Sequence, residues 1–161
     1  MTSSTDFQNP IVQHTKWMNF ALRQAELAFG LGEIPVGAIV IKGNQIIGKG
    51  HNQCESMHDP TAHAEIIAIS AAANTLQDWR LTNCIIYTTK EPCAMCTGAI
   101  INARLKMVIF GSYDEAEGCC GSRYALCSDP SFKNPVAVQG GVMEAESLAL
   151  MQSFFKSKRN S

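Results

Sequence analysis

Two stretches of this chain, Asp59-Pro60-Thr61-Ala62-His63-Ala64-Glu65 and Pro92-Cys93-Ala94-Met95-Cys96, decide its fold and its chemistry. The first contains an H-x-E pattern and the second a P-C-x-x-C pattern. Together they supply one imidazole, two thiols and one further carboxylate. Three protein ligands leave one zinc position open, which distinguishes a catalytic zinc site from a structural one. The two motifs therefore predict one catalytic Zn²⁺ per chain, with His63, Cys93 and Cys96 as its ligands.

The open position of such a site can hold a water molecule. Zinc lowers the pKa of a bound water from 15.7 to about 7, so hydroxide becomes available at neutral pH. Glu65 lies two residues after the histidine and is not needed as a ligand. It can carry protons between the water and a leaving group, which makes it the candidate catalytic residue.

Both motifs are expected at the beginning of a helix. Asp59 suits a helix cap and Pro60 suits the first helical position, so a helix is predicted over about Thr61–Asn74. Pro92 precedes a second helix over about Cys93–Asn102. The positive end of a helix dipole favours thiolates and hydroxide and lowers the pKa of cysteine. Two helix starts that converge at one sheet edge would form a metal pocket.

The remaining pattern predicts a layered α/β domain with helices on both faces of a sheet. Further helices are expected over about Gln13–Phe29 and Met143–Lys158, and residues 112–134 are polar and irregular. A hairpin signal, Lys42-Gly43-Asn44, joins the first two predicted strands. The predicted strands are Val36–Ile41, Ile46–Gly50, Cys84–Thr88, Met107–Phe110 and Val136–Gln139.

Length and composition predict one ordinary globular domain. The chain has 161 residues, of which 46% are hydrophobic and 17% charged. Residues 1–10 are expected to be a disordered lead-in, and residues 11–161 the domain. The polar start lacks the features of a signal peptide, and no apolar run reaches the ~20 residues of a membrane span. A cytoplasmic protein without a membrane segment is therefore expected.

Charge and cysteine content narrow the function only weakly. Thirteen basic and 14 acidic residues give a net charge of −1, so any nucleic-acid binding must come from a local patch. The seven cysteines are an odd number and too few for a disulfide scaffold, so thiols or metal ligands are expected.

Each motif residue also has an ordinary structural interpretation. A lone Cys-x-x-Cys is often a redox pair or half of a structural zinc site, a lone histidine is often a core residue, and a lone glutamate is usually solvated. The joint pattern favours catalytic zinc. A structural site would need a fourth protein ligand, for which Cys119, Cys120 and Cys127 are candidates, although their spacing fits no common zinc motif.

With these motifs, the chain resembles the bacterial tRNA adenosine deaminases of the cytidine deaminase-like superfamily, and the resemblance runs from about Gln13 to Arg159. The zinc signature is that of zinc-dependent nucleobase deaminases. The further shared motifs are Gly32-Glu33-Ile34-Pro35-Val36-Gly37-Ala38, His51-Asn52, Trp79-Arg80-Leu81, Lys90-Glu91, Phe110-Gly111-Ser112-Tyr113-Asp114, Gly118-Cys119-Cys120-Gly121-Ser122 and Phe154-Phe155-Lys156-Ser157-Lys158-Arg159. The resemblance implies a three-layer α/β/α fold with a mixed five-stranded sheet, and the metal and catalytic roles given above.

The resemblance also implies substrate contacts. Asn52 is the residue expected to hydrogen-bond the inserted base, although a turn asparagine is the alternative. Asp114 corresponds to a position near the RNA backbone, and a solvated loop aspartate is equally compatible. Phe154, with Phe155 and the basic residues after it, can frame an RNA-stacking surface or simply pack in the core. Glu91 is expected only to order its loop.

The implied reaction is deamination of the wobble adenosine in a tRNA anticodon loop to inosine, by a homodimer that pairs through the helices beside the zinc. Residues 123–135 depart from the family pattern: Lys133-Asn134-Pro135 stands where Asn-His is usual, and Tyr113 replaces a frequent basic residue. This departure motivates an alternative, deamination of a free base or nucleoside of the guanine or cytosine type. A non-catalytic zinc-stabilised RNA-binding module is a third hypothesis.

Overall fold

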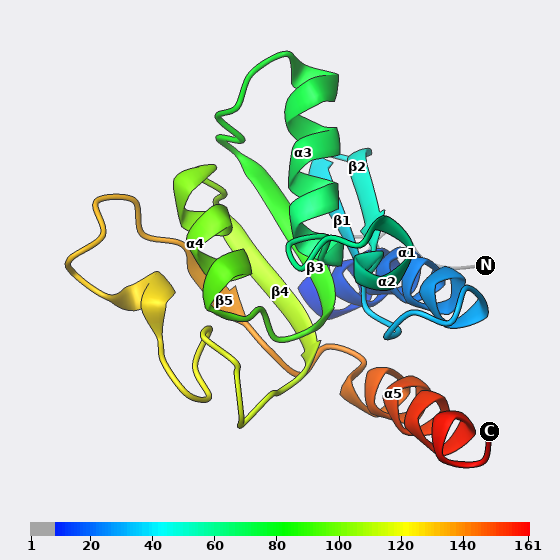
Figure 1. Cartoon of the computed structure of the whole chain (residues 1–161). Coiled ribbons are helices and arrows are strands. Elements are labelled where there is room, and N and C mark those ends of the chain that lie inside the picture. Colours follow the sequence, from blue (N-terminus) through cyan, green and yellow to red (C-terminus); the bar gives the residue numbers. More distant parts are fainter. Residues whose placement is uncertain (1–8) are drawn as a thin grey trace, which may run out of the picture.

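The computed structural model describes residues 9–161 and contains a five-stranded sheet between two layers of helices (Figure 1). Helices α1 and α5 cover one face, and helices α3 and α4 cover the other. In chain order the elements are α1 (Pro10–Gly30), β1 (Gly37–Lys42), β2 (Gln45–His51), α2 (Cys54–Met57), α3 (Ala64–Leu76), β3 (Cys84–Lys90), α4 (Ala94–Asn102), β4 (Met107–Ser112), the 3₁₀ turn η2 (Leu126–Ser128), β5 (Ala137–Gln139) and α5 (Glu144–Arg159).

The strands follow the order β2-β1-β3-β4-β5. β1 pairs antiparallel with β2 and β3, whereas β3, β4 and β5 are parallel. The sheet is therefore mixed, and the expected three-layer α/β/α fold is confirmed. Because of these directions, the end of β2, the start of β1 and the carboxyl ends of β3 and β4 meet at one edge. Among the described residues, no helix is both long and apolar enough to cross a membrane.

Two helix boundaries differ from the sequence expectation. Helix α1 begins at Pro10, because the Asn9 side chain accepts a hydrogen bond from the Ile11 N–H at 3.0 Å and Pro10 occupies the first turn. The predicted disordered lead-in of residues 1–10 thus overlaps the start of this helix at Asn9 and Pro10, and its residues 1–8 lie outside the described part of the chain.

The predicted helix over Thr61–Asn74 begins later, at Ala64, because the backbone of His63 is extended and forms the N-cap. Asp59 caps a separate turn instead, in which its Oδ1 accepts the Thr61 N–H at 2.8 Å. The one-turn helix α2 was not predicted from the sequence. The other predicted elements are present, with ends shifted by one or two residues.

Helix α3 lies directly on β2 because two strand glycines face it. A Cβ added at Gly48 would lie 2.3 Å from the Ala68 carbonyl oxygen, and one at Gly50 would lie 2.3 Å from that of Ala64. The alanines at positions 64, 68 and 72 are fully buried in the same interface. This backbone contact fixes the start of α3 at the sheet edge, where the H-x-E motif lies.

We expect Gly48→Val to destabilise the protein, because its side chain would overlap the backbone of α3 rather than a movable side chain. Overpacking costs about 1–3 kcal/mol, occasionally more, and each kcal/mol lowers Tm by about 2–4 °C in a chain of this size. Thermal unfolding checks this result. Gly30→Ala is the matched control, since a Cβ there meets nothing within 4 Å. Equal stability of Gly48→Val and the wild type would contradict the packing account.

Candidate active site

The structure brings the three predicted zinc ligands together at the edge of the sheet. The ligand atoms of His63, Cys93 and Cys96 all lie within 4.8 Å of one another. His63 is the N-cap of α3 and Cys93 the N-cap of α4, and Cys96 lies in the first turn of α4. Among the described residues no other group of His, Cys, Asp or Glu forms such a cluster, so Cys119, Cys120 and Cys127 do not make a second one.

The spacing of these atoms fits a tetrahedral zinc ion. The Nδ1 atom of His63 lies 3.6 Å from Cys93 Sγ and 3.5 Å from Cys96 Sγ. A nitrogen at about 2.0–2.1 Å and a sulfur at about 2.3 Å from the same tetrahedral zinc are themselves about 3.6 Å apart. The two distances therefore match ligands that share one metal, and three ligands leave a coordination position free.

The protonation of the two cysteines also favours a bound cation. Hydrogen bonding from Cys96 and His63 lowers the pKa of Cys93 to about 4, against the opposing effect of burial. The Cys93 thiolate, burial and the nearby Glu65 carboxylate raise the pKa of Cys96 far above its ordinary value. Cys93 can therefore be a thiolate without a metal. A second thiolate at Cys96 becomes favourable only beside a positive charge, which a zinc ion would supply.

Glu65 lies against the cluster without belonging to it. Its side chain is only 4% exposed, and burial raises its pKa. Oε2 accepts a hydrogen bond from Cys96 Sγ at 3.5 Å, and Oε1 accepts one from Thr88 Oγ1 at 3.2 Å. A buried carboxyl group with a raised pKa beside a metal cluster is suited to accept and release a proton.

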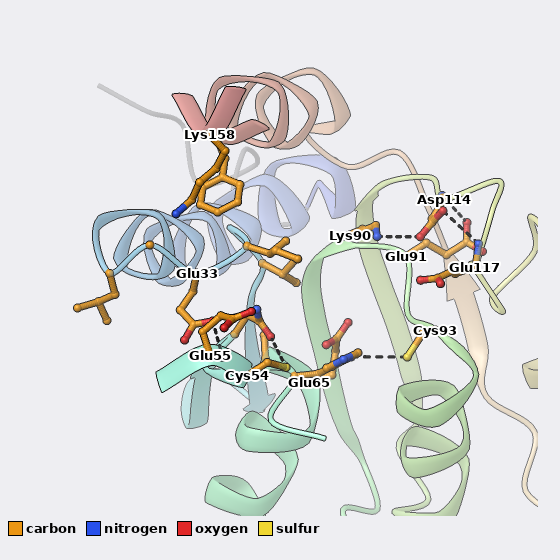
Figure 2. Close-up of a pocket in the computed structure, with 18 residues that line it drawn as sticks. Glu33, Cys54, Glu55, Glu65, Lys90, Glu91, Cys93, Asp114, Glu117 and Lys158 are labelled. Carbon is orange, nitrogen blue, oxygen red and sulfur yellow. Dashed lines mark hydrogen bonds and ion pairs between the residues drawn. The ribbon is translucent and has the colours of Figure 1, made fainter. Parts of the chain in front are cut away.

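A cavity of about 600 Å³ opens in front of this cluster (Figure 2). It is lined by all three residues that were expected to contact substrate, namely Asn52, Asp114 and Phe154. The lining also includes Leu31, Gly32, Glu33, Ile34, Val36, Cys54, Glu55, His63, Ala64, Glu65, Lys90, Glu91, Cys93, Glu117 and Lys158. None of residues 123–135 contributes to it.

Asn52 follows β2 and is 7% exposed. Its backbone N–H bonds the Val36 carbonyl at 3.0 Å, and its side-chain Oδ1 accepts from Cys54 Sγ at 3.2 Å. Its Nδ2 donates to Glu33 Oε2 at 3.5 Å. The amide group is therefore held at both ends on the wall of the cavity.

Asp114 is tied into the loop after β4 rather than free in solvent. Its Oδ2 lies 2.8 Å from Lys90 Nζ, and its Oδ1 accepts the backbone N–H groups of Ala116 and Glu117. Burial raises the pKa of Asp114, but the bond and charge of Lys90 and the two N–H bonds outweigh it and hold that pKa below its ordinary value. The carboxylate is thus ionised and oriented at the cavity.

Glu91 orders the loop that the sequence leaves irregular. Its carboxylate is 2% exposed and accepts the N–H groups of Asp114, Cys120 and Ser122 at 3.1–3.3 Å, together with the Ser122 hydroxyl. A Cβ on Gly118 would overlap the same carboxylate. These contacts fit the expected loop-ordering role of Glu91 and account for the glycine beside it.

Phe154 is buried, so core packing describes most of its contacts. Its ring makes edge contacts with Phe29 and Phe155 at centroid distances of 5.6 and 5.4 Å. The Nζ atom of Lys158 lies 5.3 Å from the centre of the Phe154 ring, and both residues reach the cavity lining. Phe155, Lys156 and Arg159 are exposed and do not line the cavity.

Several site residues were not assigned a role from the sequence. Thr88, which donates to Glu65, looks like any residue of a buried strand. Glu33 and Lys158 reach the cavity from the α1–β1 connection and from the last helix (Figure 2). Glu33 is 1% exposed, and a buried carboxylate is unusual enough to mark a site once burial is known. In the sequence, only its position in the shared motif that begins at Gly32 marked Glu33 as a candidate site residue.

Comparison with known proteins agrees with this site. A family model described as MafB19-like deaminase matches residues 12–159. The tRNA-specific adenosine deaminase of Haemophilus influenzae is 42% identical over 145 residues, which cover 89% of this chain and 84% of that protein.

Two solved structures are similar to this chain in three dimensions. One, from a study of A-to-I editing by tRNA:A34 deaminases, has a TM-score of 0.81 and 34% identity, covering 84% of this chain and 99% of that one. The guanine deaminase of Bacillus subtilis has a TM-score of 0.60 and 31% identity, covering 91% and 93%. The sequence identity and the coverage of these matches show that the chain belongs to the tRNA-specific adenosine deaminases, within the MafB19-like deaminase family.

Proposed function

We propose that this protein is a zinc-dependent hydrolase that converts the wobble adenosine of a tRNA anticodon loop to inosine, with uptake of water and release of ammonia. One observation carries the chemistry: a buried carboxyl group, Glu65, lies beside a three-ligand cluster that faces a cavity of about 600 Å³. A relative with this named activity, at 42% identity, supports the choice of substrate.

Each site residue has its own role in this reaction. His63, Cys93 and Cys96 would hold the zinc ion, which would supply a water molecule of lowered pKa as the nucleophile for the carbon that bears the amine. Glu65 would accept one proton from the water and deliver it to the ring nitrogen. It would then take the remaining proton of the added hydroxyl group and pass it to the amino group, which leaves as ammonia. The Thr88 hydroxyl orients the Glu65 carboxyl group through its 3.2 Å bond. Asn52 holds the base by its polar edge.

The charge of the cavity favours a base over a phosphate. Its lining contains two lysines, Lys90 and Lys158, and six carboxylate residues, namely Glu33, Glu55, Glu65, Glu91, Asp114 and Glu117. Phosphate groups are repelled by such a lining, while an uncharged base that has left its stack can enter. RNA phosphates would stay at the mouth, and Lys158 of α5 is a cation that the cavity lining offers them.

The free-base alternative has one observation in its favour, the similarity to a guanine deaminase at 31% identity. It was motivated by the altered segment 123–135, but that segment contributes no residue to the cavity lining. The wobble-adenosine proposal is therefore the stronger. A structural zinc module would need a fourth ligand, and the cluster in the described residues has three.

A side-by-side assay with zinc-loaded protein tests the substrate. One arm contains a tRNA anticodon stem-loop with adenosine at the wobble position, and the other contains guanine, adenine, cytosine and cytidine. Inosine is expected in the RNA arm alone. Ammonia from a small base alone would overturn the tRNA proposal and leave the catalytic residues in place.

The resemblance also supports a cytoplasmic homodimer that pairs next to the zinc site. On α4, Ile100 and Ile101 are buried within the chain, whereas Ala94 is exposed and Met95 is half-buried at the helix start, so these two residues are available for such a contact. Light scattering at low micromolar concentration should give a mass of two chains. A mass of one chain would contradict the dimer.

A further inference from the structure

The buried carboxylate Glu33 is brought to the cavity by the way α1 ends. Gly32 adopts φ = +76°, which glycine tolerates without steric cost. The Gly32 N–H then bonds the Phe29 carbonyl at 3.0 Å, and the Glu33 N–H bonds the Ala28 carbonyl at 2.9 Å. This helix ending turns Glu33 inward, where its side chain is 1% exposed and lines the cavity (Figure 2).

The carboxylate of Glu33 accepts three hydrogen bonds from the segment after β2. Oε1 accepts the Ser56 N–H at 2.7 Å, and Oε2 accepts the Glu55 N–H at 3.2 Å and Asn52 Nδ2 at 3.5 Å. The residue that precedes α2, Gln53, makes no capping bond with its own side chain, so Glu33 caps this helix from a distance. Glu33 thus binds both the helix start and the candidate base-contacting residue.

Glu33 can act only as an acceptor. Burial raises the pKa of Glu33, but the bonds from Ser56 and Glu55 outweigh it, so the pKa lies below its ordinary value and the group is ionised at neutral pH. An ionised carboxylate has no proton to donate. The Asn52 amide must therefore turn its NH₂ group toward Glu33, since the opposite orientation would place Oδ1 against a negative charge.

We propose that Glu33 is a positioning residue that fixes the orientation of the Asn52 amide, and thereby the donor and acceptor that this amide presents to the base. The proposal rests on the proposed function, in which Asn52 holds the base. The Cys54 thiol, which donates to Asn52 Oδ1 at 3.2 Å, fits the same orientation. The simpler alternative is that Glu33 only caps α2 and does not act through Asn52.

A double-mutant cycle on kcat/KM separates these two roles. Glu33→Gln keeps the size of the side chain but introduces an NH₂ group that can bond Oδ1, so Asn52 can turn over. We expect Glu33→Gln and Asn52→Ala each to lower kcat/KM by roughly 10- to 100-fold, the scale of a misplaced contact group. The double variant should be no worse than Asn52→Ala alone. Losses that multiply would overturn the proposal, because a cap acts independently of Asn52.

A second measurement needs neither activity nor a variant with Glu33 changed. In ¹⁵N NMR of the zinc-loaded wild type, the Asn52 NH₂ signal is identified by its loss in Asn52→Ala. One of its protons should exchange with D₂O more slowly than those of the exposed Asn102. Equal exchange would overturn the proposal. Inactivity of the wild type on all substrates would count against the proposed function alone, and the NMR result would still test the bond from the Asn52 NH₂ group to Glu33.

Discussion

Replacing Glu65 by alanine will lower kcat for deamination by about 10²- to 10⁴-fold, while one zinc ion per chain stays bound. The loss is expected because no other carboxyl group of the described residues lies next to the cluster in bonding distance of a ligand sulfur. Zinc should remain because its proposed ligands, His63, Cys93 and Cys96, are unchanged. Turnover and metal content measured on the same preparation check both parts.

Glu65→Gln is the matched variant for this prediction. It preserves the volume of the buried side chain and a hydrogen bond with Thr88, but its amide cannot accept and release a proton at neutral pH. A loss as large as that of Glu65→Ala would assign the effect to proton transfer rather than to a cavity. Full activity in either variant would remove Glu65 from the mechanism, and loss of zinc would make it a metal ligand.

The cluster of His63, Cys93 and Cys96 could be predicted from the sequence because its geometry is local. His63 and Cys93 are helix N-caps, and Cys96 follows within the same turn as Cys93, so the spacing within each motif already fixes half of the site. Only the convergence of the two helix starts needed the fold. Helix α4 joins the parallel strands β3 and β4, and helix α3 follows the antiparallel strand β2. These strand directions bring the first residues of α3 and α4 to one edge of the sheet.

The walls of the cavity could not be predicted in the same way, because they depend on contacts between distant segments. Glu33 acts on residues 52–56 from another loop, and Lys158 arrives from the last helix. The start of α3 was misplaced because Asp59-Pro60 is a good helix-start signal whose capping bond is used by an isolated turn. Residues Asn52, Asp114 and Phe154 were expected from family resemblance, and all three line the cavity.

Removing zinc will abolish deamination and lower thermal stability together. Cys96 is fully buried, and the adjacent Cys93 thiolate and Glu65 raise its pKa, so without a cation the cluster holds poorly compensated groups. A metal present at about 1,000 times its Kd stabilises the native state by about 4 kcal/mol. At about 2–4 °C per kcal/mol, chelation should lower Tm by roughly 8–16 °C. Calorimetry with and without chelator measures the shift.

Cys96→Ser and Cys127→Ser separate metal loss from general damage to a buried cysteine. Both positions are buried, but only Cys96 belongs to the cluster. We expect Cys96→Ser to lose zinc and activity and to show no Tm response to added zinc, because a serine hydroxyl is a poor replacement for a thiolate ligand. Cys127→Ser should keep one zinc per chain and recover its Tm after chelation when zinc is returned. If chelated wild-type protein deaminated its substrate at the original rate, zinc would have no part in the reaction. The proposed role of Glu65 beside the cluster would then have no chemical basis.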